Sequence, residues 1–234
     1  YGATWSTSRL QAKVSRDGAV TWSGAFMLHD GDGMMARNRP IVLDGGDYLL
    51  PIYHERGDDP ETVGAASTSL FLRYQQATRQ WKQTGSITSP KGVIQPAVAE
   101  LSPGRLVAYN RRGGGYGPTT EGWMIRSESA DGGWTWSPGR DTSFPNPNAA
   151  LDFVKLASGN LLLVYNDSMS RRTPLTVGLS TDGDPSYPPR RNMAKGGGDF
   201  ASPIAFQAGD GRIHVVFTSD RRTVINHAIF DEAW

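Results

Sequence analysis

Arginine recurs at the ends of apolar segments along this chain. The residues at these ends are Tyr53-His54-Glu55-Arg56, Asn110-Arg111-Arg112, Asn166-Asp167 with Arg171-Arg172, and Asp220-Arg221-Arg222. A guanidinium group presents a planar fork of N–H donors that pairs with both oxygens of a carboxylate. If the loops that hold these arginines meet on one face, the pattern predicts a site for an acidic ligand such as a sialic or uronic acid.

Polar residues also precede the apolar segments, at Arg37-Asn38-Arg39, Ile94-Gln95, Pro145-Asn146-Pro147-Asn148 and Asp199-Phe200. In a four-stranded antiparallel unit, the loop before the first strand and the loop after the second strand lie at the same end. We therefore expect both sets of loops to line one site. The candidate substrate-binding residues are Arg37, Arg39, Gln95, Arg111, Arg112, Asn148, Asn166, Arg172 and Arg221.

His54 and Glu55 are adjacent candidates for acid–base chemistry at the end of one apolar segment. The pKa of an ordinary histidine lies near neutrality, which suits proton transfer, although a loop histidine bonded to a nearby carbonyl is an equal alternative. Asp152 is the third candidate catalytic residue. Two carboxylates can form a glycosidase pair, and their separation decides between retention and inversion of configuration. The aromatic candidates for stacking on a sugar are Tyr53, Tyr116 and Trp123.

Two motifs repeat along the chain with a common period. One is a Ser-x-Asp-Gly cluster, seen as SRDGAVTWS at 15–23, SADGGWTWS at 129–137 and STDGDPSY at 180–187, with YQQATRQW at 74–81 in the same series. The other is a pair of apolar runs around a glycine turn, and the turn glycines are Gly46, Gly104, Gly159 and Gly211. Both motifs advance by 50 to 60 residues, so one structural unit of that length is repeated.

The apolar runs are short, rich in Val, Ile, Leu, Tyr and Phe, and bounded by Gly, Pro, Asp or Asn, which is typical of β-strands. Four strands in each repeated unit predict an all-β fold, a β-propeller of four-stranded antiparallel blades. We expect one domain over 1–234, with full blades at about 38–85, 94–140 and 148–190 and half-blades at 1–28 and 200–231. The Asp-Gly clusters are expected to be structural turns.

The Ser-x-Asp-Gly-Gly-x-Thr-Trp cluster resembles the Asp box, or BNR repeat, of the sialidase (neuraminidase) superfamily. The segments between the clusters, such as IQPAVAELSPGRLVAY and RRTPLTVGLSTDG, resemble those of bacterial sialidase-like proteins over nearly the whole chain. The resemblance implies a six-bladed propeller, and hence about two blades missing at the N-terminus. Alternatively, the two half-blades at 1–28 and 200–231 complete one blade of a small four-bladed ring.

The resemblance also implies three arginines that bind the substrate carboxylate, a Tyr nucleophile and a Glu that activates it. Arg172 matches one arginine position. Met124 or Trp123 stands where another is expected, and Arg111 or Arg112 can substitute from the adjacent loop. Phe200 stands in the place of the Tyr and Gln95 in the place of the Glu. An alternative register makes Arg39 the first arginine and Asp58 or Asp59 the acid.

We therefore expect a sialidase-like glycoside hydrolase that acts on acidic glycans. The changed Tyr and Glu positions leave two alternatives, a noncatalytic glycan-binding propeller and a polysaccharide lyase with His54 as base. A truncated chain with no site is a further reading. Because such glycans are extracellular, we expect a secreted or periplasmic protein.

Composition excludes several other classes of partner. The chain of 234 residues has 24 Lys and Arg against 23 Asp and Glu. A net charge of +1 gives no long-range attraction to nucleic acid or to an anionic membrane. There is no Cys and no spacing typical of a metal site. We expect a glycan ligand, no cofactor, no metal, and no nucleic-acid or membrane partner, whereas composition predicts nothing about the oligomeric state.

Overall fold

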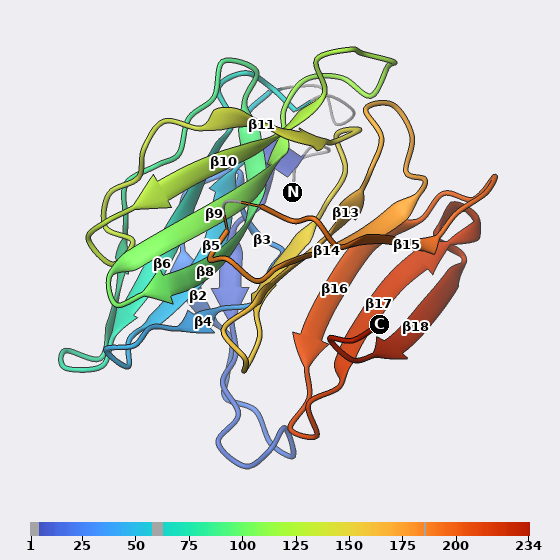
Figure 1. Ribbon diagram of the computed structural model, residues 1–234. Coiled ribbons are helices and arrows are strands. Elements are labelled where there is room, and N and C mark those ends of the chain that lie inside the picture. Colours follow the sequence, from blue (N-terminus) through green and yellow to red (C-terminus); the bar gives the residue numbers. More distant parts are fainter. Residues whose placement is uncertain (1–4, 58–62, 185) are drawn as a thin grey trace.

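Four antiparallel sheets are arranged as the blades of a β-propeller in the computed structural model, which describes residues 5–57, 63–184 and 186–234 (Figure 1). The first blade holds β3 (Met34–Ala36), β4 (Ile41–Val42), β5 (Tyr48–His54), β6 (Thr68–Gln75) and β7 (Gln80–Gln83). The second holds β8 (Val93–Ser102), β9 (Arg105–Arg112), β10 (Trp123–Ser129) and β11 (Arg140–Pro145). The third holds β12 (Asp152–Lys155), β13 (Leu161–Asn166), β14 (Leu175–Ser180) and β15 (Arg190–Ala194). The fourth holds β16 (Ala201–Gln207), β17 (Ile213–Ser219) and β18 (Val224–Phe230).

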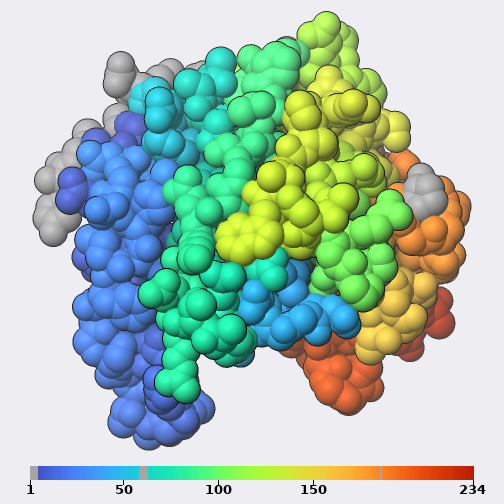
Figure 2. Space-filling view, turned by 90° about the vertical axis from the view of Figure 1, so that its left-hand side faces the viewer, coloured from blue at the N-terminus to red at the C-terminus, as the bar shows by residue number. Residues whose placement is uncertain are grey.

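The predicted fold class is confirmed, but the two ends of the chain do not join to complete one blade. The strands β1 (Leu10–Ala12) and β2 (Phe26–His29) form a two-stranded sheet of their own. Their apolar residues Leu10 and Leu28 pack on Met34 and neighbouring residues of the first blade. Within the described residues this hairpin shares no sheet with β16–β18, so the alternative of one blade built from 1–28 and 200–231 is wrong. Figure 2 shows the N-terminal segment along one side of the molecule.

Apolar side chains fill the spaces between successive blades. Leu49, Phe71 and Leu106 belong to the core between the first and second blades. Aromatic rings dominate the next core, where the ring of Tyr109 meets that of Phe153 edge to face at 4.9 Å. The strands of the fourth blade alternate buried and more exposed residues along their length, as expected when one face of a sheet packs on a core.

The Asp-Gly clusters are turns, one between β1 and β2 and two between the third and fourth strands of the second and third blades. The Asp131 carboxylate accepts hydrogen bonds from the Thr135 amide at 2.9 Å, the Thr135 hydroxyl at 2.5 Å and the Ser129 hydroxyl at 2.8 Å. The ring of Trp136 then stacks on Phe71 of the preceding blade at 4.5 Å. Asp17 and Asp182 make equivalent bonds in their own turns. These contacts give the repeated motif a structural role.

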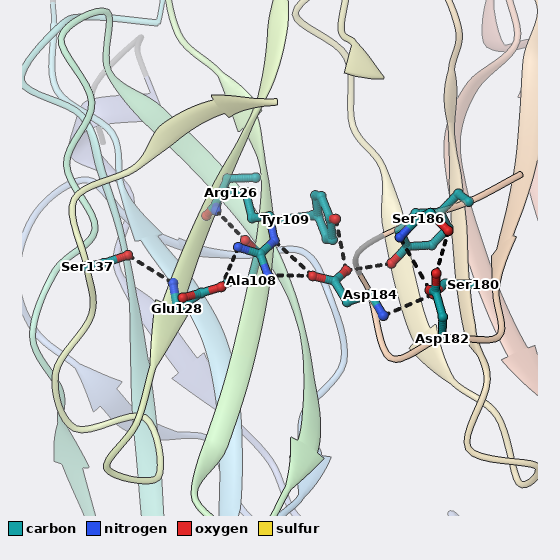
Figure 3. A network of polar contacts seen from close by, with 11 residues as sticks. Ala108, Tyr109, Arg126, Glu128, Ser137, Ser180, Asp182, Asp184 and Ser186 are labelled. Carbon is teal, nitrogen blue, oxygen red and sulfur yellow. Dashed lines mark hydrogen bonds and ion pairs between the residues drawn. The ribbon is translucent and has the colours of Figure 1, made fainter. Parts of the chain in front are cut away.

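One of these turns also links the second and third blades. Asp184 stands where the SADGGWTWS copy has Gly133, and it keeps the left-handed backbone of that position with φ 93°. Its carboxylate accepts hydrogen bonds from the hydroxyls of Tyr109 at 2.9 Å and Tyr187 at 2.7 Å, and it pairs with the Arg126 guanidinium (Figure 3). Three donors from two blades therefore converge on one buried carboxylate.

Candidate functional site

A cavity of about 780 Å³ lies at the end of the blades opposite the Asp-Gly turns. Its walls come from the ends of β3, β5 and β9, the starts of β8 and β16, and the loops that follow β9, β13 and β17. The two predicted sets of loops therefore meet around one space. Among the predicted residues, those that line it are Arg37, Glu55, Gln95, Arg111 and Arg172. Its volume lies within the range of small-molecule sites.

Arg111 is held by three side chains at the cavity wall, and it is only 8% exposed. Its Nε donates to Asn148 Oδ1 at 2.7 Å, its Nη1 to Gln95 Oε1 at 3.2 Å and its Nη2 to the Tyr116 hydroxyl at 2.8 Å. All three acceptors are neutral, so they orient the guanidinium without neutralising its charge. A cation that neutral partners hold in place at a cavity wall favours an anionic ligand.

Arg37 is held in the same way from the first blade. It donates to Asn38 Oδ1 at 2.5 Å, to the Leu151 carbonyl at 3.0 Å and to the Pro203 carbonyl at 2.8 Å. Its side chain thus reaches from the first blade to backbone of the third and fourth blades. Burial lowers the pKa of Arg37, and the positive charge of Arg111 lowers it further while Asp152 opposes the shift.

Arg172 and Arg222 form a second group on the loops that follow β13 and β17. The pKa of Arg172 is lowered by burial first and then by the charges of Arg222 and Arg111. The ring of Tyr116 lies 5.7 Å from the Arg111 guanidinium carbon and 5.9 Å from that of Arg172. These distances are typical of cation–π contacts, so one aromatic ring is shared by the two arginines.

Glu55 lines the same cavity, half-buried beside Tyr53. Burial raises the pKa of the Glu55 carboxyl above its ordinary value, and the charge of Arg111 only partly opposes this. Burial likewise raises the pKa of Tyr53. A carboxyl that keeps its proton to a higher pH can act as a general acid, which is the property required of a proton donor in glycosidic bond cleavage.

Three residues around the cavity hold left-handed backbone conformations that are unusual for side chains other than glycine. Gln95 has φ 53°, Asn148 has φ 56° and Ser202 has φ 54°. Gln95 and Ser202 lie at irregularities near the starts of the inner strands β8 and β16, and Asn148 lies in the segment before the inner strand β12. Backbone strain of this kind persists where the surroundings over-determine it, and it clusters at ligand sites. The repeated strain turns Gln95 and Asn148 toward Arg111.

Asp152 and Arg39 lie away from this cavity. Asp152 is 3% exposed and pairs with Arg39 at 3.3 Å, and it also accepts a hydrogen bond from the Ala205 amide at 2.7 Å. Burial raises its pKa, against the charge of Arg39. The structure therefore does not bring Asp152 together with Glu55. Asp58 and Asp59, the acids of the alternative register, lie outside the described residues.

The other predicted residues support the cavity or lie beside it. Arg112 is buried and donates to the carbonyls of Asn146 and Gly113, and Asn166 donates to the carbonyl of Phe200. His54 contacts the Arg56 guanidinium, and burial lowers its pKa, with further lowering by Arg56 and His29. Neither His54 nor Arg221 lines the cavity.

Several lining residues were not selected as site residues from the sequence. They are Tyr53, Tyr116, Arg171, Arg222, Asp199 and the glycines at 196–198. Tyr53 and Tyr116 were named only as stacking candidates. The sequence does carry one signal for two of the three residues with left-handed backbone, because a proline directly follows both Gln95 and Ser202. Nothing in the local sequence distinguishes Arg222 from Arg221.

The described residues contain no group of three or more His, Cys, Asp or Glu side chains that could hold a metal ion. No helix in the same part of the chain is long and apolar enough to cross a membrane.

Comparison with solved structures finds the same fold in proteins of low sequence identity. A Hadza microbial sialidase, Hz136, matches with a TM-score of 0.76 and 18% identity over 96% of this chain and 44% of its own. The NanB sialidase from Streptococcus pneumoniae matches with a TM-score of 0.74 and 16% identity, over 94% of this chain and 35% of its own. A protein of unknown function from Dyadobacter fermentans DSM 18053 matches with a TM-score of 0.72 and 18% identity, over 93% of this chain and 62% of its own. The chain thus spans less than two thirds of the length of each.

No curated protein sequence matches the chain. The family profile of the BNR repeat-like domain, in contrast, matches residues 2–215, which is most of the sequence. Together with the repeated Asp-Gly turns and the propeller, this match shows that the chain belongs to the BNR repeat-like domain family.

Proposed function

We propose that the cavity binds an acidic sugar through its carboxylate and that the protein is a sialidase-like glycoside hydrolase. The single observation that carries the proposal is the charge of the cavity wall. Five arginines line it, at 37, 111, 171, 172 and 222, against two described carboxylates, Glu55 and Asp199. Convergent guanidinium groups with neutral hydrogen-bond partners favour a ligand that supplies the missing negative charge.

Glu55 is the proposed proton donor. Burial raises the pKa of its carboxyl above the ordinary value, in the same cavity as the arginines, and cleavage of a glycosidic bond requires protonation of the leaving oxygen. Asp199 is the second carboxylate of the wall, beside Arg172. Asp152 has no part in the proposed chemistry because its side chain is paired with Arg39 away from the cavity. A lyase would require His54 as its base, and His54 does not line the cavity.

A noncatalytic glycan-binding protein is the second candidate. The observation that favours it is the pair of changes at Gln95 and Phe200. The Gln95 side chain bonds to Arg111, and the Phe200 ring packs against Phe217 at 6.1 Å. Neither side chain can supply the nucleophile or base that the resemblance implies. The arginine wall remains in both candidates, so only turnover distinguishes them. A secreted or periplasmic location stays a prediction in both.

The test measures hydrolysis of fluorogenic sialosides and glucuronides together with binding of the free sugars by calorimetry. We expect the wild type to bind and cleave, and Glu55→Gln to bind with cleavage lost. Glu128→Gln, an exposed carboxylate of the second blade, is the matched control and should cleave normally. Binding without cleavage by the wild type would favour the noncatalytic candidate. Absence of both binding and cleavage for every acidic sugar would contradict the proposal.

A further inference from the structure

The cavity wall contains three described aromatic side chains, and they differ in how much of the ring a ligand can reach. Tyr53 is 2% exposed, and the ring of Tyr116 is shared by Arg111 and Arg172. Trp5 lines the same cavity, yet it is 54% exposed. Among the described residues, no other ring and no guanidinium lies on its indole. Trp5 is therefore the aromatic surface of this wall that a ligand can cover.

Backbone hydrogen bonds hold Trp5 against the first blade although its ring is exposed. Trp5–Thr7 forms a short 3-10 helix. The amide and the hydroxyl of Ser8 both donate to the Trp5 carbonyl, at 3.1 Å and 2.7 Å. The Met34 amide of β3 in turn donates to the Ser8 carbonyl at 3.2 Å. A ring on an anchored backbone costs less entropy to order when a ligand binds.

Gly33 brings this segment beside the proposed proton donor. Its carbonyl accepts a hydrogen bond from the Glu55 amide at 2.9 Å. A Cβ atom at Gly33 would clash with the Glu55 carbonyl oxygen and would lie 3.2 Å from the Ser6 carbonyl oxygen. The backbones of Ser6 and Glu55 thus approach one point where the chain has glycine, with φ 77°. Trp5, next to Ser6, is therefore close to Glu55 along the cavity wall.

The position of a proton donor decides on which side of the acidic sugar the leaving group lies. Glu55 would protonate the oxygen that links the acidic sugar to the next unit, so that unit lies on the Glu55 side. Trp5 lines this side of the wall. A pyranose such as galactose has a face of C–H groups that packs on an indole ring while its hydroxyls stay in water. The ring of Trp5 carries no charge, which suits a neutral unit.

We infer that Trp5 binds a neutral pyranose linked to the acidic sugar, so that the preferred ligand is at least a disaccharide. The inference rests on the proposed function, because Glu55 as proton donor sets the side of the leaving unit. Trp5 is then a specificity-determining residue for the second sugar, and it has no part in binding the carboxylate.

The experiment is titration calorimetry with a free sugar acid and with its S-linked disaccharide to galactose, which a glycosidase does not cleave. Sialic acid and glucuronic acid are each tested in this way. The wild type should bind the disaccharide about tenfold more tightly than the free acid. Trp5→Ala should remove most of this preference and leave the affinity for the free acid within about twofold of wild type. Trp5→Phe keeps a ring and should retain part of the preference.

Two further measurements separate stacking from a structural effect. Trp22→Ala is the matched control, since Trp22 is 57% exposed but does not line the cavity, and its preference should equal that of wild type. The disaccharide should also change the tryptophan fluorescence of the wild type more than that of Trp5→Phe.

Equal affinity of the wild type for the acid and the disaccharide would overturn the inference while leaving the proposed function intact. So would a Trp5→Ala variant that keeps the preference, or one that loses affinity equally for both ligands. If neither the acids nor the disaccharides bind to the wild type, the proposed function fails and the inference fails with it.

Discussion

Removal of the charge at Asp184 should weaken the contact between the second and third blades. In Asp184→Asn the side chain keeps its size, but an amide nitrogen replaces the oxygen that accepts from Arg126 Nε at 2.9 Å and Nη2 at 2.5 Å. Two N–H donors then face an amide that cannot accept from them. The remaining oxygen can still accept from the hydroxyls of Tyr109 and Tyr187. The loss is therefore specific to the ion pair (Figure 3).

The size of the effect follows from the exposure of the two partners. Breaking a fully buried ion pair costs about 3–5 kcal/mol. Asp184 is buried, with its side chain 2% exposed, but the Arg126 side chain is 30% exposed and can regain water. We reduce the expected cost to about 2–3 kcal/mol for that reason. For a chain of this size, each kcal/mol lowers Tm by about 2–4 °C, so Tm should fall by about 4–12 °C.

The assay is thermal and urea unfolding of four proteins, the wild type, Asp184→Asn, Arg126→Met and the double variant. The double variant should cost less than the sum of the two single changes, because the second change removes the stranded partner of the first. Glu128→Gln is the matched control, since Glu128 pairs with the same arginine at 2.6 Å but is 57% exposed. Its effect should stay below about 1 kcal/mol. The reasoning is refuted if Asp184→Asn is no more destabilising than Glu128→Gln, or if the single costs simply add.

Three other perturbations test the cavity and the turns. Asn148→Gly removes the acceptor of Arg111 Nε, and glycine tolerates the left-handed backbone of that position. Calorimetry should show an affinity for an acidic sugar about tenfold lower than that of the wild type. An unchanged affinity would show that Asn148 does not position Arg111. The pH–rate profile of the wild type should lose activity on its alkaline side as Glu55 gives up its proton, at a pKa above the ordinary glutamate value, and Glu55→Gln should show no cleavage at any pH. A wild-type limb at the ordinary glutamate pKa would contradict the assignment. Hydrogen bonds from Thr21 and Ser15 lower the pKa of Asp17 to about 2. The contribution of Asp17 to stability is therefore present above the pKa of the unfolded chain and is lost as pH falls from about 4 to 2. In urea titrations Asp17→Asn should flatten this part of the profile of stability against pH, and an unchanged slope would contradict the role of Asp17.

The repeated strands could be predicted from sequence because each blade carries its own local signals. Apolar runs bounded by turn residues, glycines such as Gly104 and Gly159 at the hairpin turns, and the Asp-Gly clusters all recur with one period. Each of these depends on a few neighbouring residues. The arginines at the strand ends could be assigned to one face by the same logic, since antiparallel connectivity alone decides which loops lie together.

The sequence could not predict which side chains on that face contact one another. Asp152 is close in sequence to cavity residues, yet its side chain crosses to Arg39 and the Ala205 amide of other blades. The choice between Arg221 and Arg222 depends on the left-handed backbone over 220–222, which no local motif indicates. Contacts between distant segments decide both cases, and the register and twist of whole blades determine those contacts.

The most direct test of the acidic-sugar site compares a sugar acid with its uncharged carboxamide in titration calorimetry against the wild type and Arg111→Gln. The two ligands have nearly the same shape, so the comparison isolates the carboxylate. The arginine wall predicts that the wild type binds the acid at least tenfold more tightly than the amide, and that Arg111→Gln removes most of this preference. Equal binding of acid and amide by the wild type would contradict the account.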